Sequence, residues 1–175
     1  MLPNPLPTLE NDLVRLRLST EADREPLFLV AGDKLMWEQH SATDRYQRPV
    51  FDALFDDGLA GRGAFTLIDR RDERIIGSTR LKALTLTATE IGWTFLDRNL
   101  WGKGYNGSMK SLLIDYVHRE LGHDVVFLVY TGNIRSQKAV QKLGAEVITD
   151  TEHVLYPEAK DKLAFLLPTQ HRPPR

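Results

Sequence analysis

Apolar and polar positions alternate along several short runs of the chain, and this period predicts strands. Residues 12–18, DLVRLRL, alternate in this way and predict a half-buried first strand. Residues 64–84 and 87–96 hold three β-rich runs, separated by RRDE and the looser LTLTA, which predict an antiparallel meander. DVVFLVYT, beginning at residue 124, is continuously apolar, as in a central strand covered on both faces. Residues 145–156 and 162–168 predict two closing strands.

Four other segments have helical spacing. Thr20 offers an N-cap for a helix over 21–32, and Pro49 opens a second helix that ends near residue 61. From Gly104 to Gly122 an apolar stripe predicts a third helix. Its wet side should carry Lys110, Asp115 and Arg119. A last helix over 134–143 has Gly144 at its C-cap. This order of elements predicts a mixed α/β (α+β) fold built on one sheet.

Length and composition fit one domain, which we expect over residues 12–168, between a flexible arm at 1–11 and a flexible tail at 169–175. Lys and Arg number 23 against 24 Asp and Glu, a balance that argues against nucleic acid or an anionic membrane as partner.

The chain has no Cys and therefore no disulfide, zinc thiolate or Cys nucleophile. Its five histidines lack metal-ligand spacing, so no metal site is expected. With no signal peptide or apolar run of about 20 residues, a cytoplasmic location is expected.

The stretch NLWGKGYNG at 99–107 contains G-x-G-x-x-G at Gly102, Gly104 and Gly107. A dinucleotide fingerprint needs these glycines directly after a strand and an acidic residue about 20 positions later. Here DRNLWG intervenes, and the nearest acid, Asp124, opens the next strand. A P-loop lysine after the last glycine is also missing. A phosphate group at a helix N-terminus remains the functional interpretation, and a loop shaped only for chain geometry is the alternative.

Two motifs around this loop resemble one known family. The first is Q/R-x-x-G-x-G/A, matched by NLWGKG with Asn99 in the opening polar position. The second is N-x-x-S, matched by Asn133 and Ser136 at the start of a helix that ends KLGA. With the order of elements over 90–144, they resemble the GNAT superfamily of N-acetyltransferases, in the branch similar to ribosomal-protein N-terminal (alanine) acetyltransferases. The resemblance implies a twisted, mostly antiparallel sheet of about six to seven strands, with parallel strands splayed at the cofactor site and about four flanking helices.

The resemblance also implies acetyl-CoA as cofactor, with its diphosphate on the first motif and its pantetheine arm along the second. The implied cofactor-binding residues are Phe95, Leu96, Arg98, Trp101, Gly102, Lys103, Gly104, Tyr105, Asn106, Asn133 and Ser136. Among them Arg98 and Lys103 would neutralise phosphates. Packing of the loop is the alternative for Trp101, and helix capping is the alternative for Asn133.

Direct transfer of an acetyl group to an amine requires a base for the amine proton. Glu90, at the start of the strand that leads into the loop, is the candidate, and a solvated carboxylate is the alternative. With period two, Ile91, Trp93 and Phe95 should share the face opposite Glu90. Backbone near Phe95 and Leu96 would stabilise the oxyanion, and the Ser136 hydroxyl would protonate the thiolate or, alternatively, satisfy backbone donors.

The acceptor would be a small-molecule amine or a protein N-terminus. Trp37, Tyr46 and Phe51 either line its pocket or belong to the core. Four acidic residues would suit a cationic amine, with ordinary surface charge as the alternative: Asp44, Glu152, Glu158 and Asp161. A homodimer through an edge strand is compatible with the sequence. Two other functions stay open, a non-catalytic acyl-CoA sensor and an NAD(P)-dependent oxidoreductase.

Overall fold

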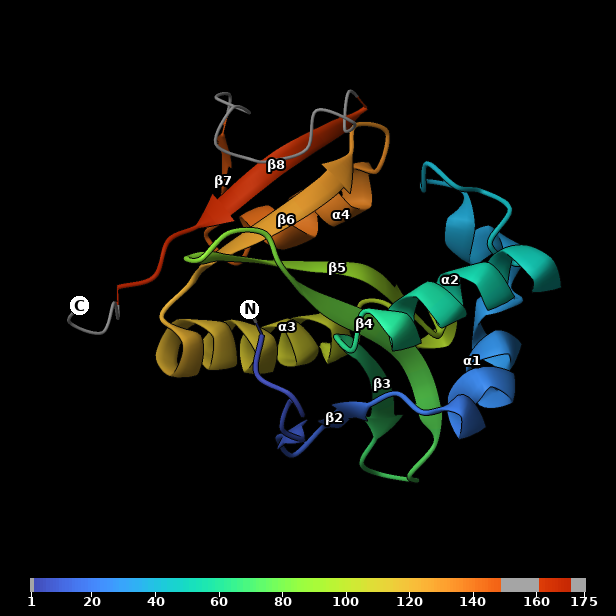
Figure 1. Cartoon of the computed structure of the whole chain (residues 1–175). Helices are drawn as coiled ribbons and strands as arrows, with labels where there is room; N and C mark the ends of the chain where they lie inside the picture. Colours follow the sequence, from blue (N-terminus) through green and yellow to red (C-terminus); the bar gives the residue numbers. More distant parts are fainter. Residues whose placement is uncertain (1, 149–160, 171–175) are drawn as a thin grey trace.

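The computed structural model describes residues 2–148 and 161–170, and its centre is one twisted sheet (Figure 1). Within these residues the sheet has eight strands in the order β1-β2-β3-β4-β5-β6-β8-β7. All neighbours are antiparallel except β5 and β6, which run parallel. The strands are β1 Leu9–Glu10, β2 Val14–Leu18, β3 Ala64–Asp69, β4 Ile75–Ala83, β5 Ala88–Leu96, β6 Asp124–Tyr130, β7 Glu146–Ile148 and β8 Lys162–Leu167. The predicted meander, the central strand and the closing strand at 162–168 are confirmed. Of the closing strand predicted over 145–156, Glu146–Ile148 form β7, and residues 149–156 lie outside the described residues.

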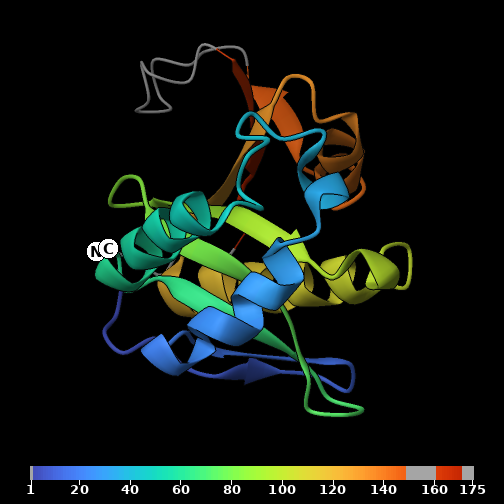
Figure 2. The same cartoon turned by 90° about the vertical axis from the view of Figure 1, so that its right-hand side faces the viewer.

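In the described part of the chain, four α-helices cover the two faces of the sheet (Figures 1 and 2). They are α1 Arg24–Ala31, α2 Arg48–Ala60, α3 Tyr105–Tyr116 and α4 Ile134–Gln141. Met109 and Leu113 of α3 and Val140 of α4 belong to the main hydrophobic core. Phe51 and Phe55 of α2 pack with Trp37 and Phe95 in a second core. The predicted mixed α/β fold on one sheet is therefore confirmed.

The ends of the helices follow their sequence signals. Thr20 and Asp23 form a capping box ahead of α1, in which the Asp23 carboxylate accepts the Thr20 backbone N–H at 2.8 Å. After α3 a π-helical turn, Val117–Leu121, continues to Gly122, which is left-handed with φ 63°. Gly144 follows α4 with φ 88°. Both predicted glycine ends are confirmed.

The parallel pair β5 and β6 separates soon after it begins. Only Ala88–Glu90 of β5 lie in register with β6, opposite Asp124–Val126. The remainder of β5 pairs with β4 alone, while the remainder of β6 pairs with β8. The strands are therefore splayed, as expected, and they leave the edge of β5 after Glu90 facing an opening.

A β-bulge lies in β5 at this opening. Gly92 is opposite Arg80 and Phe95 is opposite Ser78, so two residues of β5 face the single residue Thr79. Trp93, inside the bulge, has φ 51°. The prediction that Ile91 and Phe95 share one face is wrong, because the extra residue reverses the alternation. Ile91 belongs to the main core and Phe95 to the second core on the other face.

The N-terminal segment packs against the domain, in contrast to the flexible arm predicted at 1–11. Leu6 is buried in the main core, and Leu9–Glu10 pair with β2 as a strand too short for the sequence pattern to reveal. The Asn11 side chain donates to Ser108 Oγ at 2.8 Å, which ties this segment to the first turn of α3. Of the predicted tail, the Thr169 backbone N–H donates to Asp124 Oδ1 at 2.8 Å, and residues 171–175 lie outside the described residues.

Candidate active site

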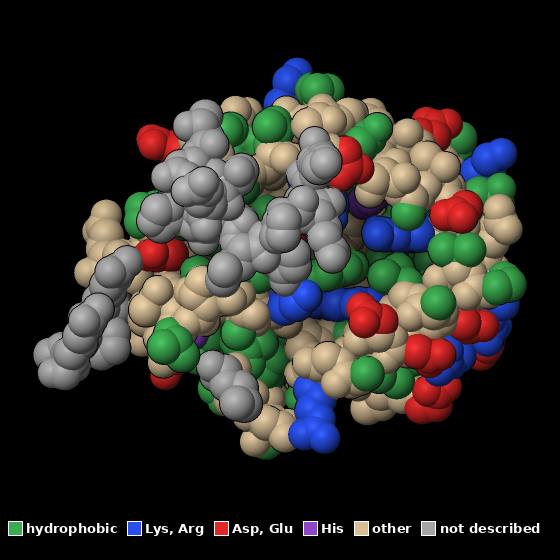
Figure 3. Space-filling model, turned by 45° about the horizontal axis from the view of Figure 1, so that its top comes forward, with side chains coloured by type: hydrophobic (Ala, Val, Ile, Leu, Met, Phe, Trp, Pro, Cys, Tyr) green, Lys and Arg blue, Asp and Glu red, His purple; other side chains and the backbone are tan. Residues whose placement is uncertain are grey.

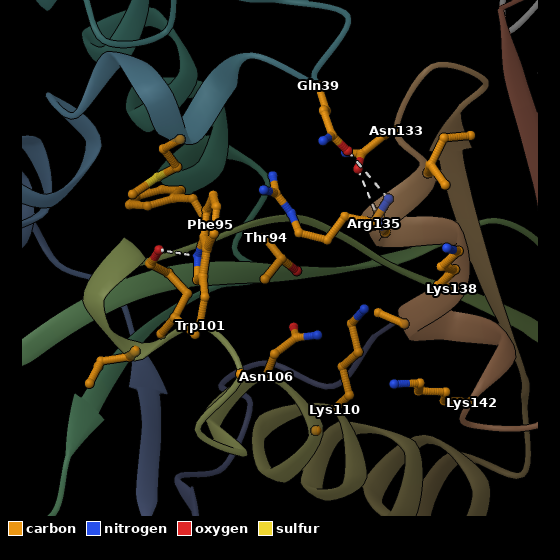
Figure 4. Close-up of a pocket in the computed structure, with 18 of the residues that line it drawn as sticks. Gln39, Thr94, Phe95, Trp101, Asn106, Lys110, Asn133, Arg135, Lys138 and Lys142 are labelled. Atoms are coloured by element: carbon orange, nitrogen blue, oxygen red, sulfur yellow. Dashed lines mark hydrogen bonds between the residues drawn. The ribbon is translucent and has the colours of Figure 1, made fainter.

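A crevice of about 750 Å³ lies where β5 and β6 separate, between the loop before α3 and the helix α4 (Figure 4). Its walls come from four parts of the chain. They include Met36, Gln39 and His40, then Thr94, Phe95 and Leu96 of β5, then Leu100, Trp101, Gly102, Gly104, Asn106, Gly107 and Lys110, and finally Asn133, Ile134, Arg135, Ser136, Lys138, Ala139, Lys142 and Leu143. Two sequence motifs about thirty residues apart therefore face each other across one cavity.

The glycine loop presents its backbone to this crevice. Gly102 and Gly104 have φ 75° and 88°, and a Cβ built on either would meet no atom within 4 Å. Their requirement for glycine is therefore conformational. Gly104 is the N-cap of α3, and the first helical bond runs from Ser108 N–H to the Gly104 carbonyl at 2.9 Å. The N–H groups of Tyr105, Asn106 and Gly107 precede that bond, as at any helix start, and suit an anion.

Three residues expected at the cofactor do not line the crevice with their side chains. Arg98 is ion-paired with Asp33, at 2.7 Å, away from the cavity walls. Lys103 is exposed outside the cavity walls, and its backbone N–H is taken by the Leu100 carbonyl at 3.2 Å. Tyr105 is buried in the main core, where its hydroxyl donates to Asp69 Oδ2 at 2.8 Å. Tyr105 is turned inward because it begins the apolar stripe of α3.

The cations at the crevice instead come from the helices. Lys138 of α4 and Lys142, the C-cap of α4, are one turn apart and line it together, and Lys110 enters it from α3 (Figure 4). The prediction that Lys110 lies on the wet side is wrong, since its side chain is 5% exposed. The sequence held a signal, because Asn106 and Lys110 are spaced i, i+4 and share the helix face that begins at the glycine loop.

Trp101 links the loop to both walls of the crevice. Its Nε1 donates to the Leu96 carbonyl at 3.0 Å, which packs the loop onto the end of β5. The guanidinium of Arg135 lies over its ring, 3.7 Å from the centroid, and so reaches across from α4. Periodicity gave no hint of this contact, because it joins two segments that are distant in sequence.

Asn133 and Ser136 cooperate at the start of α4. Asn133 is buried, and its Oδ1 accepts the Ser136 backbone N–H at 3.0 Å, so it caps the helix as the alternative interpretation proposed. The Ser136 side chain is half-buried and faces the crevice. The cap thus fixes the position of a hydroxyl at the cavity wall.

A second cavity of about 110 Å³ adjoins the crevice on the side of Glu90. Five residues line both cavities: His40, Thr94, Lys110, Asn133 and Ser136. The Glu90 side chain is buried, and this burial raises the pKa of its carboxyl to about 7, against the opposing effect of Lys162 and Lys82. A buried carboxyl group that titrates near neutral pH therefore lies next to the crevice.

The segment between α1 and α2 supplies the other side of the second cavity. His40, Ser41 and Arg45 line it, and burial, with added repulsion from Arg45 and Arg135, lowers the pKa of His40 to about 4. The imidazole is therefore neutral near pH 7. Trp37 and Phe51 lie in the second core, with Tyr46 packed against it, as their alternative interpretation predicted.

The acidic residues suggested for a cationic acceptor do not gather in the described part of the site. Asp44 and Asp161 are exposed and line neither cavity, and Glu152 and Glu158 lie outside the described residues. In residues 2–148 and 161–170 no cluster of His, Asp and Glu is arranged to hold a metal ion. No helix in that part of the chain is long and apolar enough to cross a bilayer.

Solved structures share this fold. A GCN5-related N-acetyltransferase from Brucella melitensis superposes with a TM-score of 0.75 at 17% identity, covering 94% of this chain and 79% of that one. A GNAT-family acetyltransferase from Bacillus anthracis gives a TM-score of 0.71 at 13% identity, covering 91% and 97%. Ribosomal-protein-S5-alanine acetyltransferase from Vibrio fischeri gives 0.67 at 19% identity, covering 95% and 99%.

These identities establish a common fold, and the family follows from the sequence match. A family model described as an acetyltransferase (GNAT) domain matches residues 14–146, from the start of β2 to the start of β7. This span includes the splayed strands, the glycine loop and α4. Since the match covers well over half of the 175 residues, the protein belongs to the GNAT acetyltransferase family.

Proposed function

We propose that this protein transfers an acetyl group from acetyl-CoA to a primary amine by direct attack in a ternary complex. The crevice between the glycine loop and α4 carries the proposal, because it combines helix N-terminal amides, lysines and a splayed strand edge in one cavity. Its volume of about 750 Å³ falls within the range of small-molecule sites. The adjoining cavity with Glu90 gives the amine a place to approach.

The residues present fit a diphosphate at one end of the crevice. The amides at the start of α3 donate hydrogen bonds, and the helix adds roughly half a positive charge there. Lys138 and Lys142 contribute charge from the facing wall. Acetyl-CoA, when bound, would supply the activated thioester. The chain itself binds the carrier and orients it along β5, whose edge after Glu90 is not paired with β6.

Glu90 is the proposed proton acceptor for the amine. An α-amino group titrates near 7.7–8.0, so near neutral pH most of it must lose a proton before it can attack. The Glu90 carboxyl, with its pKa raised to about 7 by burial, is well matched to this exchange. Because Glu90 lines the second cavity and not the crevice, it lies on the acceptor side.

Ser136 and the backbone of β5 complete the proposed machinery. Ser136 lines both cavities, so its hydroxyl is placed to donate a hydrogen bond to the departing thiolate. We assign the stabilisation of the carbonyl oxygen to backbone N–H groups at Trp93 and Thr94, where the pairing of β5 with β4 is interrupted beside the cavities. This assignment moves the oxyanion donors from Phe95 and Leu96 to the bulge.

Two measurements test the proposal. Coenzyme A at 100 times its Kd should add about 2.7 kcal/mol to the free energy of unfolding, whereas NAD(P) should add nothing. Acetyl-CoA supplied with a panel of amines, including peptides with N-terminal alanine, polyamines and amino acids, should release a free thiol. Stabilisation by NAD(P) alone would favour the oxidoreductase. Binding of acetyl-CoA without thiol release from any amine would favour the sensor.

A further inference from the structure

Lys110 is a buried cation at the junction of the two cavities. Its side chain rises from the second turn of α3 into the crevice (Figure 4), and 5% of the residue is exposed. The ammonium lies 5.2 Å from the centroid of the Phe127 ring on β6. Within the described residues no hydrogen bond or ion pair to a carboxylate reaches it. A lysine in this position is not required for packing, because the neighbouring core positions of α3 are apolar.

The Lys110 ammonium reaches the crevice with no carboxylate of the described residues paired to it. Burial lowers the pKa of its ammonium to about 8, so near pH 7 the group still carries its proton. A buried charge without a counter-charge destabilises the fold, and such groups ordinarily have a partner. Glu90 is not the counter-charge of Lys110, because the cations that influence its carboxyl are Lys162 and Lys82. The missing partner is therefore expected to arrive with a ligand.

The position of Lys110 separates it from the diphosphate site. The three loop glycines, Lys138 and Lys142 line only the large crevice, whereas Lys110 also lines the second cavity. A carrier held by the loop would place its diphosphate beside those glycines and lysines, and its acyl end at the junction with the second cavity, which it would share with the acceptor amine. Lys110 is thus the one of these three lysines that also reaches the second cavity.

The second cavity is basic and larger than an acetyl group needs. Its described lining holds three cations, Arg45, Lys110 and Lys162, against the single carboxyl of Glu90. Basic side chains gather around a hollow with a hydrophobic floor in Figure 3. The second cavity has a volume of about 110 Å³, several times the roughly 30 Å³ that one water molecule occupies in the liquid. It therefore has room for more than the methyl group of an acetyl chain.

From this placement we propose that Lys110 selects an acyl-CoA whose short acyl chain ends in a carboxylate, of the succinyl type. The inference rests on the proposed acyl transfer and names its donor. In the transfer, the thioester C–S bond breaks and a C–N bond forms. The amine proton passes to Glu90 and the thiolate leaves, while the distal carboxylate is unchanged and stays paired with the Lys110 ammonium.

Calorimetric affinities test the inference without an acceptor. Succinyl-CoA and butyryl-CoA have acyl chains of equal length and differ in the terminal carboxylate. The native protein should bind succinyl-CoA at least about 10-fold more tightly, as a charged hydrogen bond of 1.5–3 kcal/mol implies. Lys110→Met should remove most of this preference, and Lys110→Arg should retain it. If Lys110→Met does not fold, Lys110→Gln takes its place in the same measurement.

Lys142→Met is the matched control. Lys142 lines only the large crevice, so its loss should weaken both ligands by the same factor and leave the preference unchanged. Equal affinity of the native protein for both ligands would overturn the inference, and would point to a carboxylate on the acceptor. A preference that persists in Lys110→Met would also overturn it. If neither ligand nor acetyl-CoA binds, the proposed function itself fails.

Discussion

At the scale of single residues, the buried Glu90 carboxyl links stability to pH. Its pKa in the folded protein, about 7, is above the ordinary value of 4.5, so the unfolded chain ionises first as the pH rises. The contribution of the neutral carboxyl to the free energy of unfolding is fully present below pH 4.5, and it is lost as the pH rises through 7. Glu90→Gln cannot ionise. At pH 8 it should increase the free energy of unfolding by about 3 kcal/mol, with little difference at pH 4. Denaturant unfolding at both pH values checks this, and an equal effect at both would contradict it.

The same substitution should have the opposite effect on turnover. If Glu90 accepts the amine proton, kcat of the native enzyme should rise with pH through about 7. Glu90→Gln should lower kcat by roughly 100- to 10,000-fold and remove that part of the pH–rate profile. If Glu90→Gln is more stable and less active than the native protein, the Glu90 carboxyl acts in catalysis and is not needed for the fold. An unchanged profile would exclude Glu90 as the base.

Tyr105 gives a second test at this scale, because it separates a core residue from a cofactor ligand. Tyr105→Phe removes the hydrogen bond to Asp69, whose pKa is held below its usual range chiefly by Arg71, with a further contribution from Tyr105. We expect a loss of about 1.5–3 kcal/mol in the free energy of unfolding, typical of a hydrogen bond to a charged group. The Kd for coenzyme A should stay within twofold. A large rise in Kd without a loss of stability would return Tyr105 to the cofactor site.

The residues that sequence reasoning misplaced share one physical cause. Helical periodicity sorts side chains into a face toward the sheet and a face toward water. Lys110 belongs to neither, because the separation of β5 and β6 creates a third environment beneath α3. Arg98 was expected at the phosphates from its closeness to the loop in sequence, but Asp33, which is 65 positions away, holds it elsewhere.

At the scale of elements, the glycine loop and α3 form one unit whose geometry depends on Gly104. An alanine there would have to adopt φ 88°, at a cost of roughly 1–2 kcal/mol. Gly104→Ala should lower stability by that amount and weaken coenzyme A binding. Gly107 is the control for stability, because it is helical and an added Cβ meets no atom within 4 Å. Gly107→Ala should raise the free energy of unfolding by about 0.5–1 kcal/mol. Equal losses in both variants would contradict the conformational role of Gly104.

Elements were predictable to the extent that their signals are local. The meander, the N-cap at Thr20 and the glycine ends of α3 and α4 all follow from residues adjacent in sequence. The bulge at Trp93 could not be predicted in this way, since it exists only relative to the register of β4. The strand β1 has two residues, and its pairing with β2 depends on the burial of Leu6 nearby.

At the scale of the whole molecule, the N-terminal segment contributes to the main core. Leu6 is 5% exposed, and Leu6→Ala should lower the free energy of unfolding by about 2–5 kcal/mol. Leu86, in the turn between β4 and β5, is 85% exposed, so Leu86→Ala should change it by less than about 0.5 kcal/mol. Thermal or denaturant unfolding of both variants measures the difference. A Leu6→Ala protein as stable as the Leu86→Ala protein would show that the segment is only loosely attached.

Because β5 and β6 pair over only a short stretch, the sheet consists of two parts that meet at this pairing. Within the described residues five strands lie on one side and three on the other, and the two sides pair through Ala88–Glu90 and Asp124–Val126. A ligand that contacts both α3 and α4 bridges the two parts of the sheet and holds them together. Amide hydrogen exchange in residues 88–90 and 124–126 should therefore slow when the carrier is bound, although none of these amides lies at the diphosphate site.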